Sequence, residues 1–413
     1  MGSRDQSRRR EDRLIAESLL AGVRVVDLTT VVFGPLATQV LADYGADVIK
    51  IEPPEGDVMR FMGAAKHRGM SAIFLNLNRG KRSVPIDLKT ADGRAIVLRL
   101  LEDTDVFVHN IRRDALARLG LAHADLAPRF PRLLFCAATG FPESSRFAGD
   151  AAIDDVIQAA GGIAALNGEA KPRLVPTLLA DKSAGLGLAC AILAGLYART
   201  HTGRGSQIEV PMYDTFASFT LLEHLQGETY APAIGPAGYR RVTADGRRIY
   251  AAQNGFLTMT PYSTDQWIAY LRATDRAHLT NDRRITDPAE RSAHIAELYD
   301  LIEAATPSRT IEAWLTLAQS LGFPAKKVAT LHEVARDPEL ARSGALLETS
   351  HPTEGPVRML AAPGQFDGQP ARHPGHAPAF GEHTREVLRA AGYDNRSIDE
   401  LHHRRVVVAG DSK

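Results

Sequence analysis

The feature that most limits the possible folds is a series of short β-branched runs that alternates with helix-like segments between residues 23 and 140. Apolar runs of this kind are typical of strands that are buried on both faces of a parallel sheet. Their alternation with helices predicts βαβ units, with helices on both faces of the sheet. We therefore expect an α/β, doubly wound, mostly parallel sheet with strands near 23–29, 46–52, 84–88, 105–110 and 132–140, and helices near 35–44 and 91–102.

The carboxyl ends of these strands form the expected ligand-binding edge, because sheets of this class bind ligands there. The segments that follow the strands are 29–35, 52–60, 110–113 and 139–142. After the first strand the chain has Gly34-Pro35 instead of the GxGxxG pattern that cradles a dinucleotide pyrophosphate. Because the pattern is missing where it should stand, a nicotinamide-dependent dehydrogenase is disfavoured.

The length of the chain and a change of pattern after residue 219 predict more than one domain. A chain of 413 residues is longer than one hydrophobic core usually serves. We expect a disordered tail, a large domain, a small α+β domain, and a loop-rich linker with a C-terminal segment, at 1–13, 14–219, 220–330 and 331–413. Further elements are predicted as a hairpin turning at Asp245-Gly246, helices at 264–273, 309–321 and 330–336, and a last helix near 383–392.

The charge balance and the apolar runs exclude several classes of protein. Lys+Arg and Asp+Glu both number 49, so no basic excess indicates a nucleic-acid or anionic-membrane partner. We expect no membrane span, because no apolar run approaches the ~18 residues that one needs. The polar start is unlike a signal peptide, so we expect a cytoplasmic protein. Cys136 and Cys190 lie in apolar runs without metal or disulfide spacing, so both are predicted to be buried free thiols.

Asp181 is the residue whose position most suggests chemistry. It follows an apolar run at the start of a long apolar helix, 183–200. A carboxylate there can be an N-cap that satisfies free backbone N–H groups. It can equally be an ionised nucleophile that faces a cleft and attacks a thioester carbonyl. Sequence reasoning alone leaves both interpretations open.

Two nearby patterns also have a structural and a functional interpretation. Asp154 and Gln158 are one helical turn apart and share a face, which is either solvated or directed at a site. Gly161-Gly162 is either a simple turn or a place where main-chain N–H groups approach a ligand closely.

Several motifs in order resemble the family III CoA transferases, the formyl-CoA and carnitine CoA transferase group. They are GVRVVDLTTVVFGPLATQVLADYGADVIKIEPPEGD, RGKRSVPIDLKTADGRAIVLRLLEDTDVFVHNIRRDALARLGL, DDVIQAAGG, PTLLADKSAG, ARTHTGRGSQIEVPM and APAFGEHTREVL. The resemblance runs from about residue 20 to 407 and is weakest over 220–330. It implies a Rossmann-like CoA-binding large domain and an interlocked homodimer, whose C-terminal segment returns to the large domain.

The resemblance also implies an activity and site residues. Asp181 matches the family's nucleophile, which forms covalent aspartyl intermediates while CoA moves from an acyl-CoA to a small carboxylic acid. Gly161, Gly162 and Gln158 are the candidates for oxyanion binding and positioning. No metal or tightly bound cofactor is expected. The implied CoA contacts are Thr30, Val31, Val32, Phe33, Lys50, Glu52, Pro53, Asn110, Arg118, Thr139 and Gly140, with Arg118 as the phosphate ligand or, alternatively, a plain surface arginine.

The departures from the family pattern bear on the substrate. Val32 stands where formyl-CoA transferases have a glutamine, the lysine expected after 138–140 is missing, and no glycine-rich loop occurs in 220–260. Formate and oxalate are therefore disfavoured, and Val32 and Phe33 suggest a larger or less polar acyl group. If the acid is a dicarboxylate such as succinate, Arg60, His67 or Arg240 can pair its far carboxylate.

Two other functions fit the same fold. An α-methylacyl-CoA racemase or another acyl-CoA isomerase needs a second base, but the family's His-Asp pair reads Ile153-Asp154 here. A non-catalytic acyl-CoA-binding protein needs no nucleophile, and the presence of Asp181 argues against it.

Overall fold

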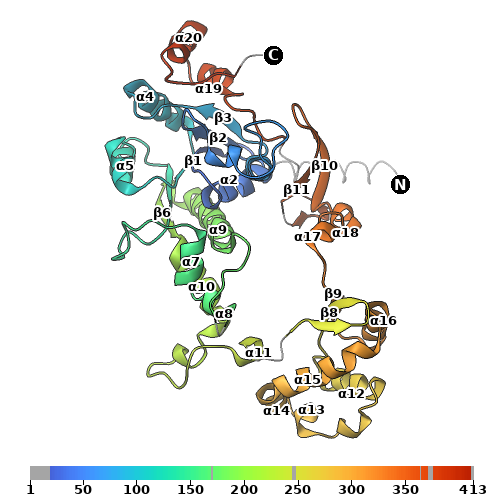
Figure 1. Ribbon diagram of the computed structural model, residues 1–413. Helices are drawn as coiled ribbons and strands as arrows, with labels where there is room; N and C mark the ends of the chain where they lie inside the picture. The colour runs from blue at the N-terminus through green and yellow to red at the C-terminus, as the bar shows by residue number, and fades with distance from the viewer. Residues whose placement is uncertain (1–18, 169–170, 244–247, 363, 371–374, 411–413) are drawn as a thin grey trace, which may run out of the picture. The chain divides into compact units, whose positions relative to one another are not determined.

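The computed structural model describes residues 19–168, 171–243, 248–362, 364–370 and 375–410 (Figure 1). Its contacts divide the chain into two compact units. The first contains the residues up to Thr220 and those from Pro338 onward, and the second is Leu221–Asp337. The predicted tail 1–13 and the predicted turn at Asp245-Gly246 lie outside the described residues.

The first unit is built on a sheet of six strands in the order β3-β2-β1-β4-β5-β6. Every neighbouring pair is parallel, which confirms the predicted α/β fold. Because the strand order reverses between β1 and β4, the crevice at their carboxyl ends is the expected ligand site. The strands are β1 (Arg24–Leu28), β2 (Asp47–Glu52), β3 (Arg82–Pro85), β4 (Val106–His109), β5 (Leu134–Thr139) and β6 (Gln207–Pro211).

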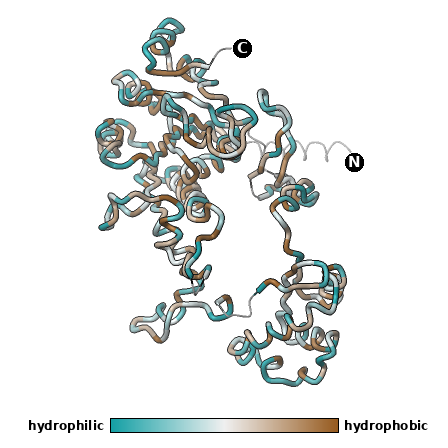
Figure 2. Tube along the Cα trace, viewed as in Figure 1, coloured by the Kyte–Doolittle hydropathy of each residue, from teal (hydrophilic) through white to brown (hydrophobic). Residues whose placement is uncertain are grey.

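Helices cover both faces of this sheet, because successive strand residues point to opposite sides. Val25 belongs to one core and Val26 to the other. Hydrophobic residues accordingly follow one another along the strands in Figure 2. The first core is closed by α2 (Phe33–Asp43), α7 (Asp154–Ala160), α9 (Leu179–Thr202) and α10 (Met212–His224). The second is closed by α4 (Ala91–Leu100), α5 (Arg113–Arg118), α6 (His123–Leu126), α19 (Thr384–Ala390) and α20 (Asn395–His403).

The C-terminal segment packs on the sheet of the first unit. Val387, Leu388 and Ile398 lie in the second core, and the Val408 N–H donates to the Pro85 carbonyl at 3.2 Å. The expectation of a loop-rich segment with one helix was incomplete. The segment also contains α18 (Pro338–Arg342), the antiparallel hairpin β10 (Leu346–His351) with β11 (Gly355–Leu360), the short pair β12 (Gln365–Phe366) with β13 (Gln369–Pro370), and α20.

The second unit is a three-stranded antiparallel sheet packed against helices. Its strands are β7 (Tyr250–Ala252), β8 (Gly255–Met259) and β9 (Ala325–Lys327). The predicted hairpin was wrong in its first arm, because α11 (Arg240–Thr243) is helical and the hairpin turns between β7 and β8 instead. The main helices are α12 (Thr264–Ala273), α13 (Arg283–Thr286), α14 (Pro288–Ala293), α15 (Ile295–Ala305), α16 (Ile311–Leu321) and α17 (Leu331–Val334).

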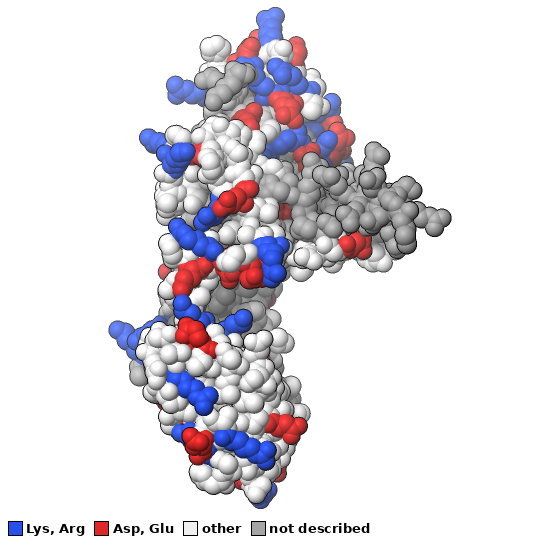
Figure 3. All heavy atoms as spheres, turned by 90° about the vertical axis from the view of Figure 1, so that its right-hand side faces the viewer, with Lys and Arg blue, Asp and Glu red and all other residues white. Residues whose placement is uncertain are grey.

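Three expectations about burial and charge can be compared with the structure. Acidic and basic side chains are interspersed on the face shown in Figure 3, as the equal numbers of the two charges suggest. Cys136 is buried, but the prediction for Cys190 was wrong, because its side chain is exposed.

Among the described helices, α9 is long and apolar enough to span a membrane by length and composition alone. Its contacts with α2, α7, β5 and β6 are those of a core helix in this unit.

Candidate active site

The candidate site lies where the carboxyl ends of β1 and β4 meet. The Thr30 N–H donates to Asn110 Oδ1 at 3.1 Å, and Asn110 Nδ2 donates back to the Thr30 carbonyl at 2.9 Å. This reciprocal pair ties together the two loops on either side of the strand-order reversal. The next residue, Val31, has a positive φ of 72° and is 38% exposed, so it presents its side chain at this edge.

A buried cluster of polar and charged side chains around Asp27 fixes the position of the loop after β1. Asp27 accepts hydrogen bonds from the Thr29 hydroxyl at 2.5 Å and the Thr38 hydroxyl at 2.6 Å, and Lys81 Nζ lies 3.2 Å from its carboxylate. Burial alone would raise the pKa of Asp27, but Lys81, Lys50 and the two hydroxyl groups outweigh it, so the pKa is lowered. Burial lowers the pKa of Lys81 to about 8, although Asp27 opposes this effect. Sequence reasoning missed both residues.

Lys50 and Glu52 lie in the core, and their side chains are fully paired there. Lys50 Nζ is 2.8 Å from Asp57 Oδ2, and Arg60 donates two hydrogen bonds of 2.7 Å to the Glu52 carboxylate. Exposure is 0% for Lys50 and 1% for Glu52. An enclosed and fully paired side chain has no free group for a ligand, so these two side chains belong to the framework, and a CoA contact through the main chain of either residue stays a prediction. Arg60 is likewise buried, at 1% exposure, so its guanidinium is not available to pair with a substrate carboxylate.

The candidate nucleophile lies on the helix that packs beside this loop. Asp181 is in the first turn of α9 and is 7% exposed. Helix α9 approaches α2 closely at Gly185, where a Cβ would come within 2.9 Å of the Phe33 carbonyl oxygen. The N-cap residue of α9 is Leu178, whose side chain makes no capping hydrogen bond, and Asp181 lies inside the first turn, so the N-cap interpretation of Asp181 is wrong. The carboxylate of Asp181 is therefore not used to cap the helix and can face a substrate.

The electrostatic surroundings of Asp181 raise the pKa of its carboxyl group to about 6. Burial is the largest cause, since it disfavours the charged form, and the neighbouring carboxylate of Asp154 adds to the effect. A hydrogen bond from the Phe33 main-chain N–H works in the opposite direction. Asp181 is thus mostly ionised at neutral pH, poorly solvated, and more basic than an ordinary aspartate.

Asp154 and Gln158 hold the start of α9, and the segment before it, by hydrogen bonds to the main chain. Asp154 Oδ1 accepts the main-chain N–H of Asp181 at 3.0 Å, and Gln158 Nε2 donates to Asp154 Oδ2 at 2.6 Å. Gln158 also donates to the Thr177 carbonyl and accepts the Val175 N–H, at 2.9 and 2.8 Å. The solvated-face interpretation was wrong, because Asp154 is 4% and Gln158 is 1% exposed.

The two glycines lie in the turn between α7 and α8 (Ile163–Leu166). The Gly161 N–H already donates to the Ile157 carbonyl at 2.8 Å, and a Cβ on Gly161 would come within 2.6 Å of Phe216. Gly162 has a φ of 88°, which favours glycine. Packing and backbone conformation therefore account for both glycines, and a role for Gly162 toward a substrate oxygen stays a prediction.

The remaining predicted contacts belong to other elements of the first unit. Arg118 at the end of α5 and Pro53 after β2 are exposed. The Thr139 hydroxyl donates to Glu209 at 3.0 Å, and the Gly140 carbonyl accepts the Tyr213 N–H at 3.0 Å. Val32 and Phe33 are each 4% exposed, so only their main chains are available to a ligand. The substrate-facing apolar wall predicted from their side chains is therefore not formed by them.

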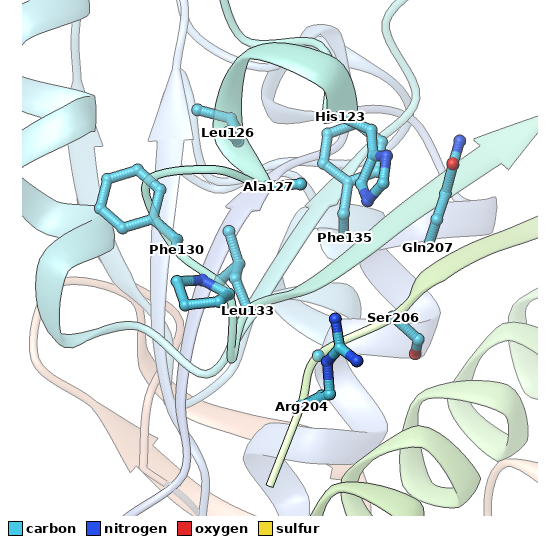
Figure 4. Close-up of a pocket in the computed structure, with 11 residues that line it drawn as sticks. His123, Leu126, Ala127, Phe130, Leu133, Phe135, Arg204, Ser206 and Gln207 are labelled. Carbon is cyan, nitrogen blue, oxygen red and sulfur yellow. The ribbon is translucent and has the colours of Figure 1, made fainter. Parts of the chain in front are cut away.

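A separate cavity of about 280 Å³ lies at the amino ends of β5 and β6 (Figure 4). His123, Phe130, Phe135 and Arg204 line it, and Asp181 does not. It is thus distinct from the site at the carboxyl ends. No group of three or more His, Cys, Asp or Glu side chains among the described residues is arranged to hold a metal ion.

Comparison with known proteins identifies relatives over almost the whole chain. Residues 20–384 match the model of CoA-transferase family III. A succinate–glutarate CoA-transferase of Agrobacterium fabrum is 29% identical, covering 89% of this chain and 94% of that protein. A formyl-CoA:oxalate CoA-transferase of Escherichia coli is 30% identical, covering 92% and 97%.

Solved structures agree with this assignment. A crystal structure of a hypothetical protein from Mycobacterium tuberculosis has a TM-score of 0.77 at 30% identity, covering 89% of this chain and 99% of that one. A CAIB/BAIF family protein from Brucella suis has a TM-score of 0.76 at 28% identity, covering 90% and 99%. The predicted resemblance is confirmed, and the chain is a member of CoA-transferase family III.

Proposed function

We propose that the protein moves CoA from an acyl-CoA thioester to a free carboxylic acid through covalent intermediates on Asp181. The observation that carries the proposal is the buried carboxylate in the first turn of α9, whose pKa is raised to about 6. A carboxylate that is ionised at neutral pH and poorly solvated is a competent nucleophile toward a thioester. CoA transfer in general is established by the family, and the aspartyl route and the acids involved are the proposal.

The first half of the reaction transfers CoA to the enzyme. An oxygen of Asp181 attacks the thioester carbonyl, the C–S bond breaks, and a mixed anhydride and CoA thiolate form. The thiolate then attacks the Asp181 carbonyl carbon. The donor acid leaves as its carboxylate, and an aspartyl-CoA thioester remains.

The second half reverses these steps with the acceptor acid. Its carboxylate attacks the aspartyl thioester and releases CoA thiolate, which leaves a new anhydride on Asp181. The thiolate attacks the acceptor's carbonyl carbon in that anhydride. The new acyl-CoA leaves and Asp181 returns as a free carboxylate, so no metal, redox group or bound cofactor is required.

The loops after β1 and β4 are the proposed CoA site. Thr30, Val31 and Asn110 lie at the strand-order reversal, and the exposed guanidinium of Arg118 is suited to pair the diphosphate. The acyl group is proposed to be larger or less polar than formate or oxalate. Apolar side chains in the loop after β2 support this, because Val58, Phe61 and Met62 are each about half exposed, at 49%, 50% and 49%.

Racemisation is the alternative chemistry for this fold, and one residue argues against it. Inversion at an α-carbon needs a base on each face. Ile153 has no titratable group and its side chain is 63% exposed, and the neighbouring Asp154 is occupied by the Asp181 N–H and by Gln158. The protein therefore lacks a free second base at this position.

The covalent route predicts a trappable adduct. On rapid quenching after mixing with acyl-CoA alone, the peptide that contains Asp181 is expected to gain the mass of the acyl group or of CoA. Hydroxylamine should remove the adduct, because anhydrides and thioesters of aspartate are activated toward amines. Mass spectrometry of the digested protein is the measurement.

The matched control for the adduct is Asp155→Asn, which alters an exposed carboxylate of α7 and should leave the adduct unchanged. Asp181→Asn should abolish it. If an acyl donor that turns over leaves the Asp181 peptide unmodified at every quench time, transfer is direct and the aspartyl route is refuted.

We further propose that the working enzyme is an interlocked homodimer in the cytoplasm. Large apolar side chains on α9 and α10 support an extensive partner surface, with Leu186, Tyr197 and Phe219 exposed at 49%, 69% and 54%. Free thiols at Cys136 and Cys190 suit a reducing compartment. Threaded chains cannot separate without unfolding, so sedimentation at nanomolar protein is expected to show only dimer. A monomer boundary under native conditions would contradict the interlocked arrangement.

A further inference from the structure

The carboxylate of Asp154 faces the main chain of the proposed nucleophile. Asp154 is 4% exposed, and its Oδ1 accepts the main-chain N–H of Asp181 at 3.0 Å. A buried carboxylate beside a second buried carboxylate is electrostatically costly. Sequence reasoning gave this residue no role in the transfer reaction, and the contact brings together residues that are 27 positions apart.

The position of Asp154 is fixed by its other contacts. Its Oδ2 accepts from Gln158, and Gln158 is held by the main chain at Val175 and Thr177. Asp154 also lies in the first turn of α7, where the positive end of the helix dipole stabilises a carboxylate. These contacts keep the charge of Asp154 in place while the segment 175–181 is held against it.

We propose that Asp154 is the positioning residue for Asp181: its carboxylate fixes the nucleophile's main chain, and its charge favours formation of the covalent intermediate. This inference rests on the proposed function. In the free enzyme two carboxylates lie together, whereas acylation converts Asp181 into a neutral anhydride or thioester. The repulsion is therefore present before the attack and absent after it, so acylation is favoured by the amount of repulsion that it relieves.

Among the described residues, the charged groups on α2, β5, β6 and α9 that lie near the start of α9 are paired or held elsewhere. From α2, the contact is the main-chain N–H of Phe33, and Asp43 at the far end of that helix is paired with Arg79. From β5 and β6, Cys136 lies in the core and Glu209 accepts from Thr139. On α9 itself, the ammonium group of Lys182 donates to the Thr177 hydroxyl at 2.6 Å.

The test measures the single-turnover rate of Asp181 acylation by acyl-CoA as a function of pH. In the wild type the acid limb is expected near pH 6, where Asp181 loses its proton. Asp154→Asn keeps an oxygen acceptor for the Asp181 N–H and removes the charge, so the limb should move about one unit toward lower pH. The plateau rate should fall ~10–100-fold, because the nucleophile is less basic and the hydrogen bond from Gln158 that holds residue 154 in place is lost. Since the substrate is the same in every variant, its own ionisations cancel in the comparison.

Two further variants separate charge from structure. Asp155→Asn makes the same change on the exposed side of the same turn and should move neither the limb nor the plateau. Asp154→Glu keeps the charge but moves it, so the acid limb should stay at the wild-type pH while the plateau rate falls. This variant also provides the test if Asp154→Asn does not fold. An acid limb that Asp154→Asn leaves at the wild-type pH, with the Asp181 adduct still forming, overturns this inference alone. Failure of the adduct in the wild type overturns the proposed function instead.

Discussion

Asp181→Ala and Asp181→Asn are expected to abolish CoA transfer, with turnover reduced ~10⁴-fold or more. Neither side chain can form an anhydride with the donor acid, and no other described carboxylate is placed to replace it, because Asp154 is occupied by the Asp181 N–H and by Gln158. Steady-state exchange of CoA between two acids is the measurement. CoA binding should be retained, because the loops at Thr30 and Asn110 do not depend on the carboxylate.

Asp181→Asn is also expected to stabilise the folded protein against unfolding at neutral pH. The pKa of Asp181 is raised from 3.8 to about 6 on folding, so the folded chain binds this proton more tightly than the unfolded chain. The contribution of the group to stability is therefore greatest below pH 4 and falls as the pH rises to about 6. Above that pH the buried charge costs roughly 1–3 kcal/mol, which Asp181→Asn removes.

Stability and activity together distinguish the nucleophile from a helix cap. Calorimetry at pH 7 should show a higher Tm for Asp181→Asn, and the advantage should shrink toward pH 4. Loss of an N-cap would instead lower stability by ~1 kcal/mol and leave turnover intact. A variant that keeps more than about a tenth of wild-type turnover would exclude Asp181 as the nucleophile, since nucleophile loss costs several powers of ten.

The sequence predicted those parts of the fold that local pattern determines. β1, β4 and β5 are largely apolar runs and β2 alternates apolar residues with Lys50 and Glu52, so the local pattern indicates all four without knowledge of the partner strand. β6 was missed, because it is a five-residue edge strand whose exposed Gln207 and polar Glu209 break the apolar pattern. Its pairing with β5 joins residues that are 72 positions apart, from Phe135↔Gln207 to Thr139↔Pro211. Such a contact leaves no local signal in a single sequence.

The site shows the same division between local and long-range information. Asp181 could be singled out because its motif and the helix start are adjacent in the chain. The partners that set its properties could not, because Asp154 and Phe33 come from other elements. One signal was available for the framework: Lys50 and Glu52 alternate with apolar residues inside a strand, and side chains two apart in a strand share a face. A buried ionic layer was therefore predictable, although its partners Asp57 and Arg60 were not.

That ionic layer gives the second large effect: Glu52→Gln is expected to destabilise the protein by ~3–5 kcal/mol. Arg60 is 1% exposed and donates two hydrogen bonds of 2.7 Å to Glu52, and its guanidinium lies 3.8 Å from the centroid of the Phe74 ring. Removing the carboxylate charge leaves this guanidinium buried without its counter-ion. The measurement is the Tm and the denaturant midpoint of the protein, with the KM for acyl-CoA measured on the folded enzyme.

Two comparisons make this prediction specific. Glu55→Gln removes a charge from the exposed part of the same loop and should change Tm little, since surface substitutions usually stay within about 0.5 kcal/mol. The double variant Glu52→Gln with Arg60→Met should recover part of the loss, because an apolar side chain can fill the space between Phe74 and Phe380 without an unpaired charge. Were Glu52 a CoA contact instead, Glu52→Gln would raise the KM and leave the Tm near that of Glu55→Gln. The opposite pattern is expected, because a carboxylate enclosed by Arg60 and Ser83 has no free face for a ligand.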